Sequence, residues 1–91
     1  MSFDELSEVM PRVNIMKIIS NAVESILYIE DFDLFISDDE IIFLINMNTE
    51  IRITISCIEN NIKYNEDNSL IIINMINSQI IMSVRRKDIS E

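Results

Sequence analysis

The chain contains no glycine in 91 residues, but it contains 21 isoleucines and 10 asparagines. Glycine is the residue that most readily adopts positive φ in tight turns, so the turns of this chain must use other residues. Asn and Asp tolerate positive φ and bond to nearby backbone through their side chains. We therefore expect a fold in which short isoleucine-rich segments are separated by turns rich in Asn and Asp.

The missing residue types also exclude several classes of site. Without glycine the chain cannot form a Gly-rich phosphate-binding loop or a twelve-residue calcium loop. Without histidine it lacks the usual proton shuttle at neutral pH and the commonest zinc ligand, and Cys57 cannot form a Cys–His nucleophile. We expect Cys57 to be a small core residue. The sequence thus predicts a protein that is not an enzyme, with no catalytic, cofactor-binding or metal-binding residues.

Length and composition predict one domain that spans residues 1–91. Hydrophobic residues make up 48% of the chain, enough to form a core. The apolar runs 41–45 and 70–73 are far shorter than the roughly 20 residues of a membrane-spanning helix. The first residues are acidic, unlike a signal peptide, and the single cysteine does not suggest a disulfide-stabilised secreted domain. These features predict a cytoplasmic protein.

Two helical segments are expected at the N-terminal end. Ser2 and Glu5 have the spacing of a capping box, and Pro11 should break or kink the helix that they begin. A second, amphipathic helix is expected from Arg12 to about Tyr28. Its apolar half would be formed by Ile15, Met16, Ile18, Ile19, Ala22, Val23, Ile26 and Leu27.

After Glu30 the apolar residues alternate with a period of two, which predicts strands. The expected strands are 32–36, 41–47, 51–57, 62–64, 70–76 and 79–86. The gaps between them are short enough for hairpins, whereas parallel crossovers need a dozen or more residues. We therefore predict an α+β fold, in which an N-terminal helix, broken near Pro11, packs on a five- or six-stranded antiparallel meander sheet.

The pairing of two strands depends on the length of the loop near Asn48. A three-residue loop at 48–50 places Ile41, Phe43, Ile45 and Met47 inside, while a two-residue loop inverts the two faces. For the last hairpin, a turn at 77–78 pairs residue 73 with 82. One face of that hairpin then carries Ile71, Ile73, Met75, Ile80, Met82 and Val84.

The sheet has more apolar surface than one helix can cover. With the three-residue loop, six residues form the uncovered face: Leu70 and Ile76, together with the four residues Ile42, Leu44, Ile72 and Ile81. At about 80 Å² per residue this face approaches 500 Å². A second copy, the first helix or another protein must cover such a patch. We predict a homodimer that uses these four residues as its oligomer face.

The formal net charge is −9, from 16 acidic and 7 basic residues. This sign disfavours direct contact with nucleic acid or an anionic membrane and favours a basic protein partner. The candidate partner-binding acids lie in predicted turns or, for Asp33, beside one, and they are Glu30, Asp31, Asp33, Asp38, Asp39 and Glu40.

Charge and the missing residue types together predict a small acidic inhibitor that neutralises a basic partner. It would resemble an immunity protein against a basic toxin. It would otherwise resemble a phage-type antagonist, encoded by a virus or mobile element, of a nucleic-acid-binding system. The alternative is a non-catalytic adaptor, chaperone or homodimeric structural protein that binds through an apolar sheet face. In that case the acidic residues serve solubility alone.

Overall fold

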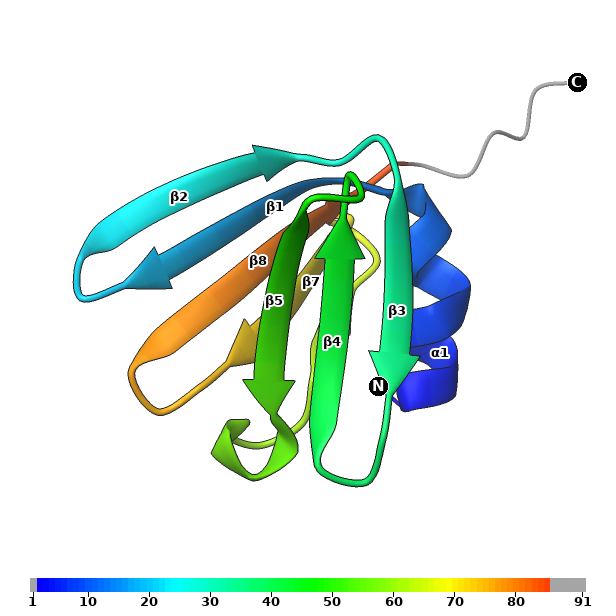
Figure 1. Cartoon of the computed structure of the whole chain (residues 1–91). Coiled ribbons are helices and arrows are strands. Elements are labelled where there is room, and N and C mark those ends of the chain that lie inside the picture. The colour runs from blue at the N-terminus through cyan, green and yellow to red at the C-terminus, as the bar shows by residue number, and fades with distance from the viewer. Residues whose placement is uncertain (1, 86–91) are drawn as a thin grey trace, which may run out of the picture.

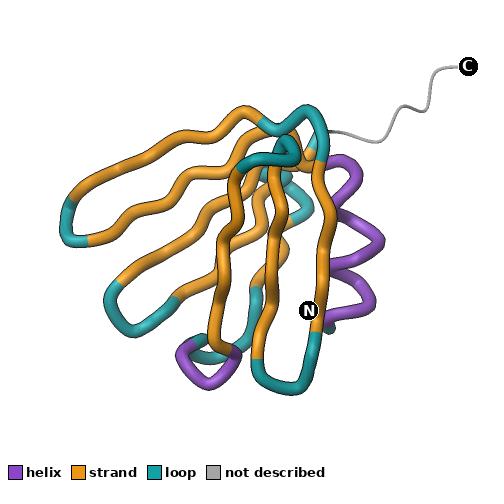
Figure 2. Tube along the Cα trace, viewed as in Figure 1, coloured by secondary structure: helices purple, strands orange, loops and turns teal. Residues whose placement is uncertain are grey.

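The computed structural model describes residues 2–85 and contains one α-helix and eight antiparallel strands in two sheets (Figures 1 and 2). The five-stranded sheet has the order β2-β1-β8-β7-β6, and the three-stranded sheet has the order β3-β4-β5. The elements are α1 (Phe3–Val9), η1 (Met10–Arg12), β1 (Val13–Ser20), β2 (Val23–Tyr28), β3 (Phe32–Ile36), β4 (Glu40–Ile45), β5 (Thr49–Thr54), η2 (Ile55–Cys57), β6 (Lys63–Asn65), β7 (Leu70–Asn74) and β8 (Ser78–Val84). The mixed α+β class is confirmed, but the single meander sheet is wrong.

The two sheets share one core. Figure 1 shows the three-stranded sheet lying across the five-stranded sheet, and buried side chains from both belong to the same cluster. The largest fully buried side chain is Phe43 of β4, which lies in this cluster with Met16 of β1 and Ile73 of β7. The fold is therefore a two-layer arrangement in which each sheet has an inner, apolar face and an outer face.

Helix α1 begins at the predicted capping box. The Glu5 backbone N–H donates to Ser2 Oγ, and the Ser2 backbone N–H donates to the Glu5 carboxylate. The α-helix ends at Val9, and Pro11 lies in the 3₁₀ turn that follows, as the missing N–H of proline requires. Leu6 of α1 and Met10 of η1 are fully buried in the cluster that both sheets share, so this N-terminal helical segment contributes to the core.

The predicted helix from Arg12 to Tyr28 is wrong, because this segment forms the β1–β2 hairpin. Asn21 and Ala22 form its turn with φ values of 51° and 65°, the pattern of a type I′ turn. Because both faces of β1 carry apolar residues, the same apolar positions also fill one half of a helical wheel. The pattern therefore fits a helix as well as it fits a hairpin. The β-branched content of the segment was the available contrary evidence, because such residues favour strands.

In the three-stranded sheet the strand positions are close to those predicted. Ile41, Phe43 and Ile45 are fully buried, as the three-residue loop required, although that loop spans residues 46–48. Met47 was expected inside but lies in the turn at φ 65° and is 77% exposed. Strand β5 ends at Thr54, and the half-buried Cys57 lies in η2.

The last hairpin has the predicted inner face with a different register. Ile73 pairs with Ile80 and Ile71 with Met82, a shift of two residues from the expected pairing. A shift of two preserves the alternation of faces, so these four residues are buried as predicted. Strand β8 also pairs with β1, and this contact joins the two ends of the chain in the middle of the larger sheet.

Candidate functional site

The charged residues divide between the two layers. Residues 30–54, which form the three-stranded sheet and its connections, carry seven acids and one base, a net charge of −6. Residues 13–29 and 63–85, which form the five-stranded sheet, carry three acids and three bases. Most of the net charge of −9 is therefore concentrated in one layer.

The outer face of the three-stranded sheet combines apolar and acidic side chains. Phe35 pairs with Ile42 across β3 and β4, and Leu44 follows two positions along β4. Phe35 is 55% exposed, and Ile42 and Leu44 are half-buried. We call this surface the acidic face, and its outward positions are Asp33, Phe35, Glu40, Ile42, Leu44, Glu50, Arg52 and Thr54.

Arg52 is the one basic residue of the acidic face. Its Nε lies 2.7 Å from Glu50 Oε2 and its Nη1 lies 3.1 Å from Glu40 Oε1. The bond to Glu50 and the charges of both glutamates raise the pKa of the Arg52 guanidinium. Arg52 therefore orders two carboxylates from neighbouring strands and leaves Asp33 as the third acid of the face.

The six predicted partner-binding acids all belong to this layer, but they do not form one cluster. Asp33 and Glu40 point from the outer face, while the other four lie in connections at its two ends. At the β2–β3 end, the backbone N–H groups of Glu30 and Asp31 donate to Asn46 Oδ1, at 2.8 and 3.1 Å. At the β3–β4 end, the backbone N–H of Asp39 donates to Ser37 Oγ and Asp38 is exposed.

The predicted oligomer face is not a single surface. Ile42 and Leu44 lie on the outer face of the three-stranded sheet, whereas Ile72 and Ile81 form a cross-strand pair on the outer face of the five-stranded sheet. Because the sheets pack through their inner faces, these two outer faces point in opposite directions. The expected contiguous patch came from placing all strands in one sheet, and it is wrong.

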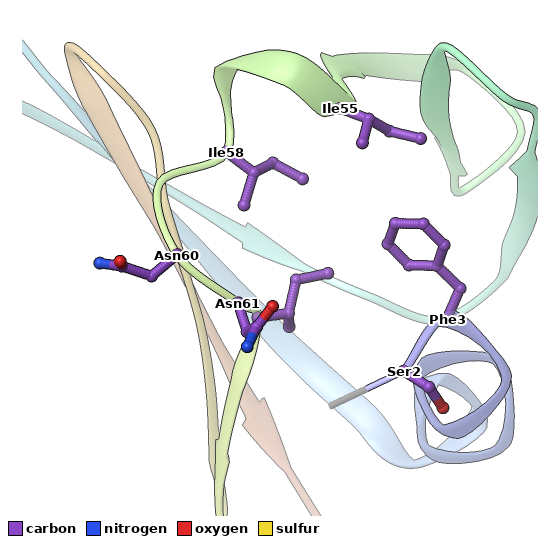
Figure 3. A pocket seen from close by; sticks show the side chains of 7 residues that line it. Ser2, Phe3, Ile55, Ile58, Asn60 and Asn61 are labelled. Carbon is purple, nitrogen blue, oxygen red and sulfur yellow. The ribbon is translucent and has the colours of Figure 1, made fainter.

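A cavity of about 370 Å³ opens between the start of α1 and the segment after β5. In Figure 3, Phe3 faces Ile55 and Ile58 across the opening, while the Asn60 amide points away from it. The lining contains no charged residue and is made of Ser2, Phe3, Ile55, Ile58, Asn60, Asn61 and Ile62. Three of the seven lining residues are polar (Ser2, Asn60 and Asn61), and none of the seven is an acid or a base.

Sequence reasoning missed four residues of the acidic face as site residues, namely Phe35, Glu50, Arg52 and Thr54. The alternation in strand 32–36 places Phe35 on the same side as Asp33, opposite Phe32 and Leu34. The alternation in the sequence therefore already placed an aromatic residue, Phe35, on the outward face of this strand, and this was the signal for a binding surface.

Comparisons with protein-family models, with curated proteins and with solved structures gave no match to this chain. Within residues 2–85, no helix has the length and apolar character needed to cross a bilayer. In the same residues, no group of three or more Asp, Glu or Cys side chains is arranged to hold a metal ion.

Proposed function

We propose that this chain is a non-catalytic protein-binding inhibitor whose acidic face docks on a basic surface of its partner. The observation that carries the proposal is the concentration of charge in one layer, where residues 30–54 hold seven acids and one base. Complementary charge of this kind speeds encounter with a basic partner and disfavours acidic ones. A basic toxin bound by an immunity protein, or a nucleic-acid-binding protein bound by a phage-type antagonist, has such a surface.

The centre of the acidic face supports protein as the partner. Specific interfaces have an apolar, often aromatic, core inside a polar rim. Phe35, Ile42 and Leu44 supply an apolar centre, and the carboxylates supply the rim. Docking on this face would cover the exposed phenyl ring of Phe35 while the carboxylates meet cations around it.

A second candidate function uses the same centre without the charges. In that case the chain is an adaptor, chaperone or structural protein, and Phe35 with its neighbours provides most of the binding free energy. The exposure of Phe35 favours this alternative equally. Salt distinguishes the two, because added salt weakens electrostatic capture steeply and apolar docking very little.

The test is capture of partners by the immobilised chain from a lysate of its native cells at low and high salt, followed by identification of the bound proteins. Two charge-reversal variants, Asp38→Lys/Asp39→Lys and Asp31→Lys/Asp33→Lys, change opposite ends of the acidic face. Glu66→Lys/Asp67→Lys is the matched control, because it makes the same charge change in the exposed β6–β7 turn of the balanced layer.

We expect the two acidic-face variants to remain folded and to associate with the captured partner more slowly, while the control associates at the wild-type rate. Phe35→Ala should accelerate dissociation instead. Equal slowing by all three charge reversals would mean that only net charge matters. Unchanged rates in both acidic-face variants would contradict the inhibitor proposal and favour the adaptor.

A further inference from the structure

Strand β2 is an uncovered edge of the five-stranded sheet. It pairs only with β1 among residues 2–85, and it forms the margin of that sheet in Figure 1, where the β1–β2 hairpin extends away from the three-stranded sheet. Three of its large apolar side chains are exposed, with exposed fractions of 64% for Val23, 48% for Ile26 and 69% for Tyr28. Long apolar edges of this kind are templates for pairing with another strand.

Two bonds show which backbone groups of β2 face outward. The Ile29 N–H donates to the Asn14 carbonyl, so odd-numbered positions face β1. The Tyr28 carbonyl accepts from Asn46 Nδ2 at 2.8 Å, so even-numbered positions face away from β1. Because the direction alternates along a strand, the N–H and C=O groups of Glu24 and Ile26 also face outward. They have no strand partner within the described chain.

The other sheet edges carry features that block pairing. Strand β6 has three residues and begins with Lys63, β5 presents Glu50 and Arg52, and β3 presents Asp33. Short edges and outward charges are the usual protection against edge-to-edge association. Strand β2 has one charged residue, Glu24, and Lys17 Nζ lies 3.4 Å from its carboxylate. It is thus the edge with the least protection in residues 2–85.

We propose that β2 pairs antiparallel with β2 of a second copy of this chain, with Ser25 facing Ser25 of the other copy. In this register Glu24 of each chain exchanges two backbone hydrogen bonds with Ile26 of the other. Only the free outward groups are used, and the Tyr28 carbonyl remains bound to Asn46. A register with Ile26 facing Ile26 would instead pair Glu24 with Tyr28, and it would need the Tyr28 carbonyl that already accepts from Asn46. The resulting two-fold interface joins the larger sheets into one continuous sheet of ten strands.

Charge supports a second copy as the occupant. Two chains of net charge −9 repel each other, so they must meet where the charge is balanced. The five-stranded layer has equal numbers of acids and bases, and β2 lies at its margin. One strand per chain is a small interface compared with the roughly 800 Å² per partner of a stable complex, so we expect a weak dimer that forms at micromolar concentration.

Light scattering after size exclusion tests the assembly, and should report twice the chain mass of 10.6 kDa at micromolar concentration. Ile26→Pro removes an outward N–H from each chain but no bond to β1, since proline is tolerated at an edge whose N–H faces solvent. We expect it to raise the dimer dissociation constant about tenfold or more. Phe35→Ser, an uncharged change on the acidic face, is the matched control and should leave the constant unchanged.

Cross-linking tests the register. Directly opposed residues outside the hydrogen-bonded pairs have Cα atoms about 4.5 Å apart, which suits a disulfide. In a Cys57→Ser background, Ser25→Cys should therefore form a disulfide-linked dimer under mild oxidation. Val23→Cys faces Leu27 of the other copy in this register, so it should cross-link much more slowly.

The dimer and the proposed function can fail separately, because added salt should strengthen β2 pairing and weaken capture by the acidic face. A monomer at high micromolar concentration in moderate salt would overturn the dimer. Two results with variants would also overturn it: a folded Ile26→Pro variant that still forms the dimer as the wild type does, or a Phe35→Ser variant that no longer forms it. If Ile26→Pro does not fold, Ile26→Lys takes its place. Hydrogen exchange of the wild-type dimer must then also show protected amides at Glu24 and Ile26, whose N–H groups pair in this register.

Discussion

Asn46 and Tyr28 join the two sheets: Asn46 Nδ2 in the β4–β5 turn donates to the carbonyl of Tyr28, the last residue of β2, at 2.8 Å. Asn46 Oδ1 accepts the backbone N–H groups of Glu30 and Asp31, and the Asn46 N–H donates to the Asp31 carbonyl. One amide side chain thus holds the connection through which the chain leaves the five-stranded sheet and enters the three-stranded sheet.

Asn46→Ala should lower the free energy of unfolding by about 1–3 kcal/mol, because it removes three hydrogen bonds and places alanine at φ 53°. Chemical denaturation measures the loss. Asn46→Gly tolerates the positive φ and isolates the contribution of the bonds. Asn48→Ala in the same turn is the control, and an equal loss in that variant would contradict the proposed role of Asn46.

Ala22→Gly should stabilise the protein. Ala22 has φ 65° in the β1–β2 turn, a conformation that costs alanine energy and glycine very little. The added freedom of glycine in the unfolded chain offsets part of the gain, so we expect about 0.5–1 kcal/mol and a Tm roughly 2–8 °C higher. Differential scanning calorimetry measures this change in Tm, and Ala22→Val should lower Tm in the same experiment. A lower Tm for Ala22→Gly would contradict the type I′ turn.

The carboxyl group of Glu5 should titrate below its ordinary pKa of 4.5, because the backbone N–H and the hydroxyl of Ser2 donate to it. A lowered pKa means that the folded state favours the charged form. The stabilisation is therefore complete above pH 4.5 and is lost as the pH falls through the folded pKa. NMR titration of the Glu5 carboxyl carbon measures the midpoint, which Ser2→Ala should move upward. A midpoint at or above 4.5 in the wild type would contradict the capping box.

Leu6→Ala should lower the free energy of unfolding by about 2–5 kcal/mol, because Leu6 is fully buried in the core that both sheets share. A seven-residue helix has little stability by itself, so the contact also holds α1 in place. The exposed Glu8→Ala on the same helix should change the value by less than about 0.5 kcal/mol. Similar denaturation midpoints for the two variants would mean that α1 is not part of the core.

The parts that sequence reasoning predicted correctly depend on neighbours along the chain. The capping box needs Ser2 and Glu5, which are three residues apart, and β3 follows from the alternation in Phe32–Ile36. The buried positions of β4 and the last hairpin also follow from a period of two. The expected partner of Ile73 was wrong by two residues, but a shift of two leaves the same side chains on the inner face. Local spacing therefore determined which residues of a strand share a face, while the choice of the buried face of β4 also depended on the loop length.

Tertiary structure decided what local spacing leaves open. The segment 13–28 is compatible with an amphipathic helix, and it is a hairpin because β1 pairs with β8, more than 50 residues away in the sequence. The division of the strands into two sheets separates Ile42 and Leu44 from Ile72 and Ile81, and concentrates the acids in one layer. A strand is stabilised by hydrogen bonds to partners distant in sequence, whereas a helix satisfies its own backbone. Sequence spacing by itself therefore determined the inward and outward positions of most strands, and only the folded chain decided which strands are neighbours and where the acidic face and the β2 edge lie.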